Sequence, residues 1–194
     1  MGFDPLYAFV FAGLFSPGPN VILLTASGAR FGFKPTIPHV LGVAAGVGII
    51  AALTGLGVGA LLSARPGLEL ALKLGAGAWI LWMAWKLWTS TRAAEADGKD
   101  RPFTFVEAVL FQWINPKIWA VALAASSGFA IGLPPGQEAL RLASAFSGIN
   151  LFVCLFWSFA GSLLAYLLTA PSAWRLFMRI MSGALAISAA MVFL

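Results

Sequence analysis

Two proline-containing interruptions lie near the middle of two long apolar segments of this chain. The first covers residues 16–20 (SPGPN) and the second covers residues 115–117 (NPK). A proline lacks an amide hydrogen and clashes with the carbonyl four residues earlier, so it breaks a helix. Lipid cannot satisfy the backbone groups that such a break frees, so a break at membrane depth persists only where protein or a cavity surrounds it. Paired breaks of this kind indicate a binding site in a membrane transporter.

The composition places these segments in a membrane. Of the 194 residues, 60% are hydrophobic and 10% are charged, whereas about 25% of residues are charged in soluble domains. A membrane-crossing helix needs about 20 apolar residues. Six stretches meet this length, at residues 6–28, 38–63, 68–89, 105–128, 140–168 and 173–193. We therefore predict an all-α polytopic membrane protein with six transmembrane helices.

The basic residues gather at the ends of these segments, so the net charge of +5 favours contact with a membrane surface over nucleic acid. Positively charged loops stay in the cytoplasm. The connections after the first, third and fifth segments carry more Lys and Arg than the opposite side. We therefore predict a protein of the bacterial inner membrane with both termini outside. The residues compared are Arg30, Lys34, Lys86, Arg92, Lys99, Arg101, Arg175 and Arg179 against Arg65, Lys73 and Arg141.

A polar connection at residues 90–104 divides the chain into halves 1–89 and 105–194, each with three segments. Because three is odd, the second half would insert upside down relative to the first. The two proline breaks fall in the first segment of each half, as expected of an inverted repeat, which is a recurrent design of secondary transporters. We predict a single membrane domain of two inverted three-helix repeats, with helices 1 and 4 broken at mid-membrane. A chance occurrence of the prolines is the alternative.

Each break also predicts binding chemistry. Ser16 and Asn115 are good N-cap residues followed by proline, so each predicts the start of a half-helix. The free amides and the positive dipole end of a half-helix bind anions. The prolines should free the carbonyls of Gly13, Phe15 and Gln112, which suit an ammonium group. Together the two breaks favour a zwitterionic ligand.

Lys117 is the one charged residue near the middle of any apolar segment. A cation in a bilayer costs at least about 2.5 kcal/mol, and no acidic residue lies at a similar depth. We expect Lys117 either to be neutral in the empty site or to meet an anion such as a substrate carboxylate. The alternative is a lysine that snorkels to an interface or caps the carbonyls of another helix.

Other polar and small residues carry weaker signals. Asn150, inside the fifth segment, predicts either a helix–helix hydrogen bond or a substrate contact. Cys154 is the one cysteine, which excludes a disulfide within the chain and is typical of packing. His39 is the one histidine, is expected in a connection, and makes a metal site improbable. Gly42 and Gly46 indicate close helix packing.

These motifs resemble those of the LysE/RhtB family of amino-acid exporters. The resemblance rests on residues 16–20, on Gly42-x-x-x-Gly46 and on residues 113–119 (WINPKIW), and it extends to the length and the motif order. It implies secondary active export of amino acids or their derivatives, driven by an ion gradient. From the residues we expect small amino acids or related compounds as substrates, proton antiport as the coupling, and alternating access by rocking of the two halves. Many relatives carry an acidic residue just after the glycine pair. This chain has Val47 there, which makes Lys117 the candidate proton carrier.

Ten residues are predicted to bind the substrate: Ser16, Pro17, Gly18, Pro19, Asn20, Gln112, Asn115, Pro116, Lys117 and Asn150. The expected partners are an amino-acid substrate and the lipid bilayer, and a homo-oligomer is compatible with the sequence. We expect no cofactor, no metal, no nucleic acid and no enzymatic activity. The main alternative is an exporter of a metal or another cation with the same architecture. A membrane enzyme with a thiol relay, which would need a second cysteine, and a channel are further alternatives.

Overall fold

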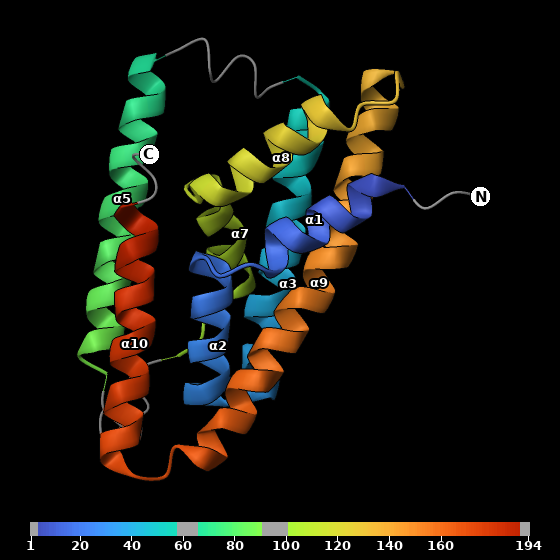
Figure 1. Ribbon diagram of the computed structural model, residues 1–194. Helices are drawn as coiled ribbons and strands as arrows, with labels where there is room; N and C mark the ends of the chain where they lie inside the picture. Colours follow the sequence, from blue (N-terminus) through green and yellow to red (C-terminus); the bar gives the residue numbers. More distant parts are fainter. Residues whose placement is uncertain (1–3, 58–65, 91–100, 191–194) are drawn as a thin grey trace.

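The computed structural model of the protein describes residues 4–57, 66–90 and 101–190, and regular structure within these ranges is entirely α-helical (Figure 1). This confirms the predicted all-α class. The helices are α1 (Pro5–Phe15), α2 (Pro19–Phe31), α3 (Phe33–Gly55), α5 (Pro66–Trp88), α7 (Phe105–Trp113), α8 (Pro116–Gly128), α9 (Pro135–Leu167) and α10 (Pro171–Ala190).

Both predicted helix breaks are present. The axes of α1 and α2 meet at 58°, and those of α7 and α8 meet at 65°. The second break follows the prediction, because Asn115 is the N-cap of α8 and Pro116 its first residue. The first break begins its half-helix later than predicted, at Pro19 with Gly18 as the N-cap. The reason is that Ser16 is the C-cap of α1, and its amide donates to the carbonyl of Ala12 at 3.2 Å.

The number of membrane spans is supported in part. By length and apolar composition α3 and α9 can each cross a membrane, and each bent pair can form one further span. The remaining two long helices, α5 and α10, carry more polar sequence, including Arg175 and Arg179 in α10. The part of the chain that the structure describes therefore supports two to four spans. Six spans, the inverted repeat and the halves 1–89 and 105–194 stay predictions.

The two broken segments pack against the two long unbroken helices. Helix α3 lies along α9, the first broken segment contacts α9, and the second contacts α3. Helices α5 and α10 run side by side and contact the rest of the described structure mainly through α2 (Figure 1). One hydrophobic cluster, with Val43 and Phe146, joins α1, α2, α3, α7, α8 and α9. A second, with Ile80 and Leu185, joins α2, α5, α7 and α10. The breaks therefore lie against the central pair α3 and α9.

Glycines allow these helices to approach closely. A Cβ atom on Gly46 of α3 would lie 2.6 Å from Cγ of Gln112 in α7, and one on Gly42 would overlap the α7 backbone. The contact between α2 and α9 is closer still. An added Cβ at Gly28 of α2 or at Gly161 of α9 would overlap a backbone carbonyl oxygen of the other helix. The predicted packing function of Gly42 and Gly46 is therefore confirmed.

His39 lies inside α3, so the prediction that it belongs to a connection is wrong. Gly32 alone separates α2 from α3, and its φ of +85° is a conformation that glycine adopts readily. Helix α3 therefore begins at Phe33, five residues before the predicted apolar stretch at residues 38–63. The His39 ring is buried, lies 5.0 Å from the Phe103 ring, and has no hydrogen-bond partner among the described residues.

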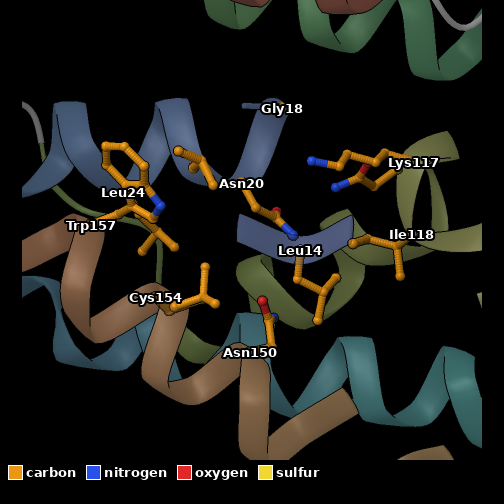
Figure 2. A pocket seen from close by; sticks show the side chains of 12 residues that line it. Leu14, Gly18, Asn20, Leu24, Lys117, Ile118, Asn150, Cys154 and Trp157 are labelled. Atoms are coloured by element: carbon orange, nitrogen blue, oxygen red, sulfur yellow. The ribbon is translucent and has the colours of Figure 1, made fainter. Parts of the chain in front are cut away.

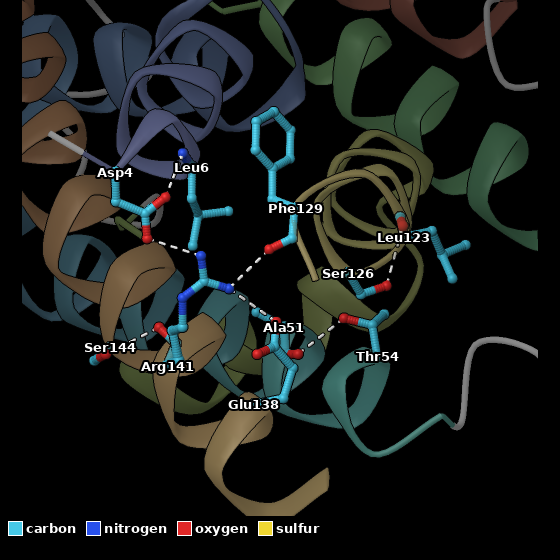
Figure 3. Close-up of polar contacts among 10 residues, drawn as sticks. All are labelled: Asp4, Leu6, Ala51, Thr54, Leu123, Ser126, Phe129, Glu138, Arg141 and Ser144. Carbon is cyan, nitrogen blue, oxygen red and sulfur yellow. Dashed lines mark hydrogen bonds and ion pairs between the residues drawn. The ribbon is translucent and has the colours of Figure 1, made fainter. Parts of the chain in front are cut away.

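Arg141 joins three elements at one end of the bundle (Figure 3). Its guanidinium donates to Asp4 at 2.7 Å, to Glu138 at 2.9 Å and to the carbonyl of Phe129 at 3.0 Å. Asp4 is the N-cap of α1, where it also accepts the amide of Leu6, and Phe129 is the C-cap of α8. The first and fourth segments are therefore both tied to α9 at this end.

The Asp4–Arg141 pair predicts a loss of stability in acid. The hydrogen bond from Arg141 and that from the Leu6 amide lower the pKa of Asp4 below its usual 3.8. A lowered folded-state pKa contributes stability above the unfolded value and loses it as the pH falls through the folded one. We expect Asp4→Asn, which keeps the N-cap, to lower the melting temperature at pH 6 and to make little difference at pH 2. A difference that is the same at both pH values would contradict this prediction.

Candidate functional site

The two helix breaks face each other through Lys117. From the first turn of α8 its ammonium donates to the carbonyl of Ser16, to the Ser16 hydroxyl at 2.9 Å and to the carbonyl of Pro17 at 3.4 Å. Its half-buried side chain thus places a cation at the C-terminal end of α1, where the helix dipole favours positive charge. Of the alternatives that the sequence left open, the capping of another helix's carbonyls is the one present here.

The carbonyls available at the breaks differ from those predicted. The carbonyl of Gly13 accepts the Ser16 hydroxyl at 2.9 Å, and that of Gln112 accepts the amide of Asn115 at 3.2 Å. A nearby hydroxyl and a tight turn therefore replace the amides that the prolines lack. At the first break Lys117 binds two further carbonyls, those of Ser16 and Pro17, which the prediction did not include.

A second link between the breaks is a pair of buried amides. Asn20 Nδ2 donates to Gln112 Oε1 at 2.8 Å, and Gln112 Nε2 donates back to Asn20 Oδ1 at 3.2 Å. Gln112 Nε2 also donates to the carbonyl of Ala108 at 2.9 Å. This reciprocal pair joins the first turn of α2 to the last turn of α7. Gln112 is therefore committed to Asn20 and does not line the pocket described next.

A pocket lies between the breaks and the middle of α9 (Figure 2). Its volume of about 10 Å³ has room for about one water molecule. Half of the predicted substrate residues line it and half do not. Those at the pocket are Gly18, Asn20, Asn115, Lys117 and Asn150, and those outside its lining are Ser16, Pro17, Pro19, Gln112 and Pro116.

Several polar groups at this pocket have no partner in the described chain. Both side-chain polar atoms of Asn115, which is 0% exposed, and Nδ2 of Asn150, which is 2% exposed, make no hydrogen bond there. The indole nitrogen of Trp157 is also buried without a partner. An unpaired buried polar group costs about 1–3 kcal/mol. Unpaired groups at one pocket are therefore expected of a site that completes its hydrogen bonds with a ligand.

The α9 side of the pocket contains residues that sequence reasoning missed. Val153, Cys154 and Trp157 follow Asn150 at spacings of three, four and seven residues, and all four line the pocket. This spacing defines one helix face, so Asn150 could have predicted its neighbours. Cys154, interpreted from the sequence as packing, also lines the pocket. The remaining lining residues are Leu14, Val21, Leu24 and Ile118.

The electrostatics of the pocket favour an anion. The first turns of α2 and α8 both contribute to its wall, so the positive ends of two helices meet there. Lys117 is the one charged side chain among the described lining residues. Outside the undescribed stretches, no three His, Cys, Asp or Glu side chains come together as a candidate metal site.

The family of LysE type translocators matches residues 11–194, which include both breaks and every lining residue of the pocket. The chain belongs to this family. This confirms the resemblance that the two proline motifs indicated, and it agrees with a membrane protein that moves a solute. Membership of a translocator family also points away from an enzyme.

The translocator is similar to proteins named cysteine/O-acetylserine efflux protein. That of Salmonella choleraesuis strain SC-B67 is 29% identical over 152 residues, or 76% of each chain. That of Escherichia coli O1:K1 / APEC is 29% identical over 153 residues, again 76% of each chain. No solved structure matches the translocator.

Proposed function

We propose that the translocator exports small amino acids or their derivatives across the bacterial inner membrane. The observation that carries the proposal is the pocket itself, where two helix N-termini, Lys117 and the unpaired amides of Asn115 and Asn150 meet between the two breaks. The relatives named for cysteine and O-acetylserine efflux support an amino-acid substrate. A positively charged wall disfavours the alternative, an exporter of metal ions or other cations.

The substrate carboxylate would be bound by the donors of this pocket. In the first turn of α2, after Gly18, and of α8, after Asn115, the backbone amides have no earlier carbonyl within their helix. The side-chain amides of Asn115 and Asn150 add donors that are unpaired in the described structure. A carboxylate that reaches both helix N-termini gains the electrostatic stabilisation of two dipoles.

Transport would proceed by alternating access. A pocket of about 10 Å³ is too small for an amino acid, so its walls must separate before the substrate binds. In the proposed arrangement the halves 1–89 and 105–194 form six spans as two inverted repeats, with both termini outside and the breaks at mid-membrane. Rocking of one half against the other would open the pocket to each side in turn. Proton antiport through Lys117 would drive the cycle.

The test is transport in proteoliposomes that contain the purified full-length protein. With an imposed pH gradient we expect saturable uptake of cysteine or O-acetylserine, whereas transport that does not saturate would indicate a channel. Lys117→Met should reduce gradient-driven flux at least about tenfold. A tenfold reduction corresponds to a free-energy change of about 1.4 kcal/mol. Lys117→Arg should retain binding but lose coupling, because arginine does not release its proton.

Each arm has an outcome that contradicts the proposal. Full gradient-driven flux in Lys117→Met would refute the coupling function of this lysine. Absence of flux for every amino acid tested, from a wild-type protein that is shown to be folded, would refute amino-acid export.

A further inference from the structure

We propose that Lys117 occupies the subsite for the substrate's α-ammonium, so that the substrate must displace the lysine in order to bind. This inference rests on the proposed function and deepens it. The geometry that carries it is the placement of the Lys117 ammonium on three oxygens, the carbonyl and hydroxyl of Ser16 and the carbonyl of Pro17.

The three oxygens suit any primary ammonium. Lys117 Nζ has three N–H donors, and the two carbonyls and one hydroxyl at the first break supply three acceptors. An amino acid carries a group of the same charge and the same donor number. Ser16 and Pro17 lie outside the pocket lining, and the Lys117 side chain, which lines the pocket, reaches their oxygens. No carboxylate lines the pocket in the described chain, so these neighbouring oxygens and the unpaired Oδ1 of Asn115 are suitable ammonium acceptors. Two ammonium groups would therefore compete for one set of acceptors.

The rest of the pocket is complementary to the other end of a zwitterion. The donors Nδ2 of Asn150 and Nε1 of Trp157 come from α9 and are unpaired among the described residues. Figure 2 shows both side chains across the pocket from Lys117, whose ammonium extends towards Gly18. The lysine therefore occupies the oxygens of Ser16 and Pro17. These α9 donors, together with the first-turn amides of α2 and α8, stay available for the carboxylate. The remaining lining is mostly apolar, which indicates an amino acid with an uncharged side chain.

Displacement of Lys117 provides a route for proton coupling. A displaced ammonium loses its three oxygens, and it would share a small pocket with a second ammonium of the same charge. From α1 and α2 no titratable side chain lines the pocket, and from α9 only Cys154 does so. Lys117 would therefore release one proton to water as the substrate binds, and it would regain one after the substrate leaves on the other side. The expected exchange is one proton for one substrate.

Gly18 offers a variant that moves Lys117 without changing its charge. A Cβ atom on Gly18 would lie 2.7 Å from Cδ and 3.0 Å from Nζ of Lys117. The backbone of Gly18 is extended, with φ −177° and ψ 179°, so alanine can adopt it. The lysine side chain is flexible and should swing away. Gly18→Ala is therefore expected to free the ammonium subsite while the lysine remains.

The decisive measurement is binding of a probe that has an amine but no carboxylate. We would titrate n-propylammonium, and propionate as the opposite probe, into the full-length protein in lipid nanodiscs. Lys117→Met and Gly18→Ala should each bind propylammonium about tenfold more tightly or better, because apparent affinity rises with the fraction of free subsites. The matched controls are two variants that should leave the propylammonium affinity unchanged. Lys34→Met removes an exposed lysine, and Gly148→Ala adds a Cβ that meets no atom within 4 Å.

Several outcomes separate this inference from its alternatives. Unchanged propylammonium affinity in both Lys117→Met and Gly18→Ala would overturn it. If Lys117 binds the substrate carboxylate instead, Lys117→Met should weaken propionate and leave propylammonium unchanged, which also overturns it. The propylammonium measurement needs no amino-acid transport. Displacement of Lys117 can therefore be refuted while amino-acid export stands, and export can be refuted while displacement stands. In weakly buffered solution, a wild-type protein that transports an amino acid yet releases no proton on binding it would likewise overturn displacement.

Discussion

Replacing Gly161 by alanine should destabilise the translocator, whereas the same change at Gly148 in the same helix should not. A Cβ atom on Gly161 would overlap the backbone carbonyl of Thr25 in α2, and the reciprocal contact places Gly28 against the carbonyl of Ser158. The obstacle is backbone, so no side-chain rotation can relieve it. The helices would have to separate, and overpacking of this kind costs about 1–3 kcal/mol.

The Gly148→Ala control is expected to change stability in the opposite direction from Gly161→Ala, or not at all. An added Cβ on Gly148 meets no atom within 4 Å, and alanine is more favourable than glycine inside a helix by about 0.8–1.0 kcal/mol. Thermal unfolding of the purified proteins in one detergent should therefore place Gly161→Ala below wild type and Gly148→Ala at or above it. Equal melting temperatures for the two variants would contradict the close crossing of α2 and α9.

Replacing Asn115 by leucine should raise stability and remove transport. Asn115 is the N-cap of α8, but its side chain makes no capping hydrogen bond, and it is fully buried without a partner among the described residues. An apolar side chain with the same branching removes an unpaired group that costs about 1–3 kcal/mol. The substrate loses the same amide, so flux in proteoliposomes should fall about tenfold or more, equivalent to about 1.4 kcal/mol.

Gln112→Leu is the matched comparison for this prediction. Gln112 is also fully buried, but its amide is paired with that of Asn20, so its replacement leaves Asn20 without its partner. We expect Gln112→Leu to melt below wild type, opposite in sign to Asn115→Leu. A lower melting temperature for Asn115→Leu would show that its amide has a structural partner. Normal flux would show that it does not contact the substrate.

The sequence predicted the breaks well because proline acts locally. The missing amides at Pro19 and Pro116 end one hydrogen-bond ladder and start another wherever the chain goes, and both bends lie at these positions. The exact start of α2 was missed because Ser16 can either cap the new half-helix or extend the old one. Its bonds to Ala12 and Gly13 in α1 decide the choice, and neither bond is implied by the motif.

The candidate site was also predictable in part from the sequence. The residue types were evident, since a lysine and several amides inside apolar segments stand out in any membrane sequence. Their partners were not evident, because Lys117 bonds to residues about 100 positions away and Asn20 to one 92 positions away. The face that contains Val153, Cys154 and Trp157 was readable as a helical period, but nothing local indicated that it faces the breaks rather than lipid.

The sequence by itself determined where the helices break, which polar residues lie beside the breaks, and the family to which the chain belongs. Only the tertiary structure decided that the lysine of one break caps the carbonyls of the other, and that Asn115 and Asn150 remain unpaired at a shared pocket. The physical reason is that prolines and caps act within one helical turn. Hydrogen-bond partners across helices depend on how those helices cross, and glycine contacts such as those of Gly28 and Gly161 between α2 and α9 lie far from the proline motifs in sequence.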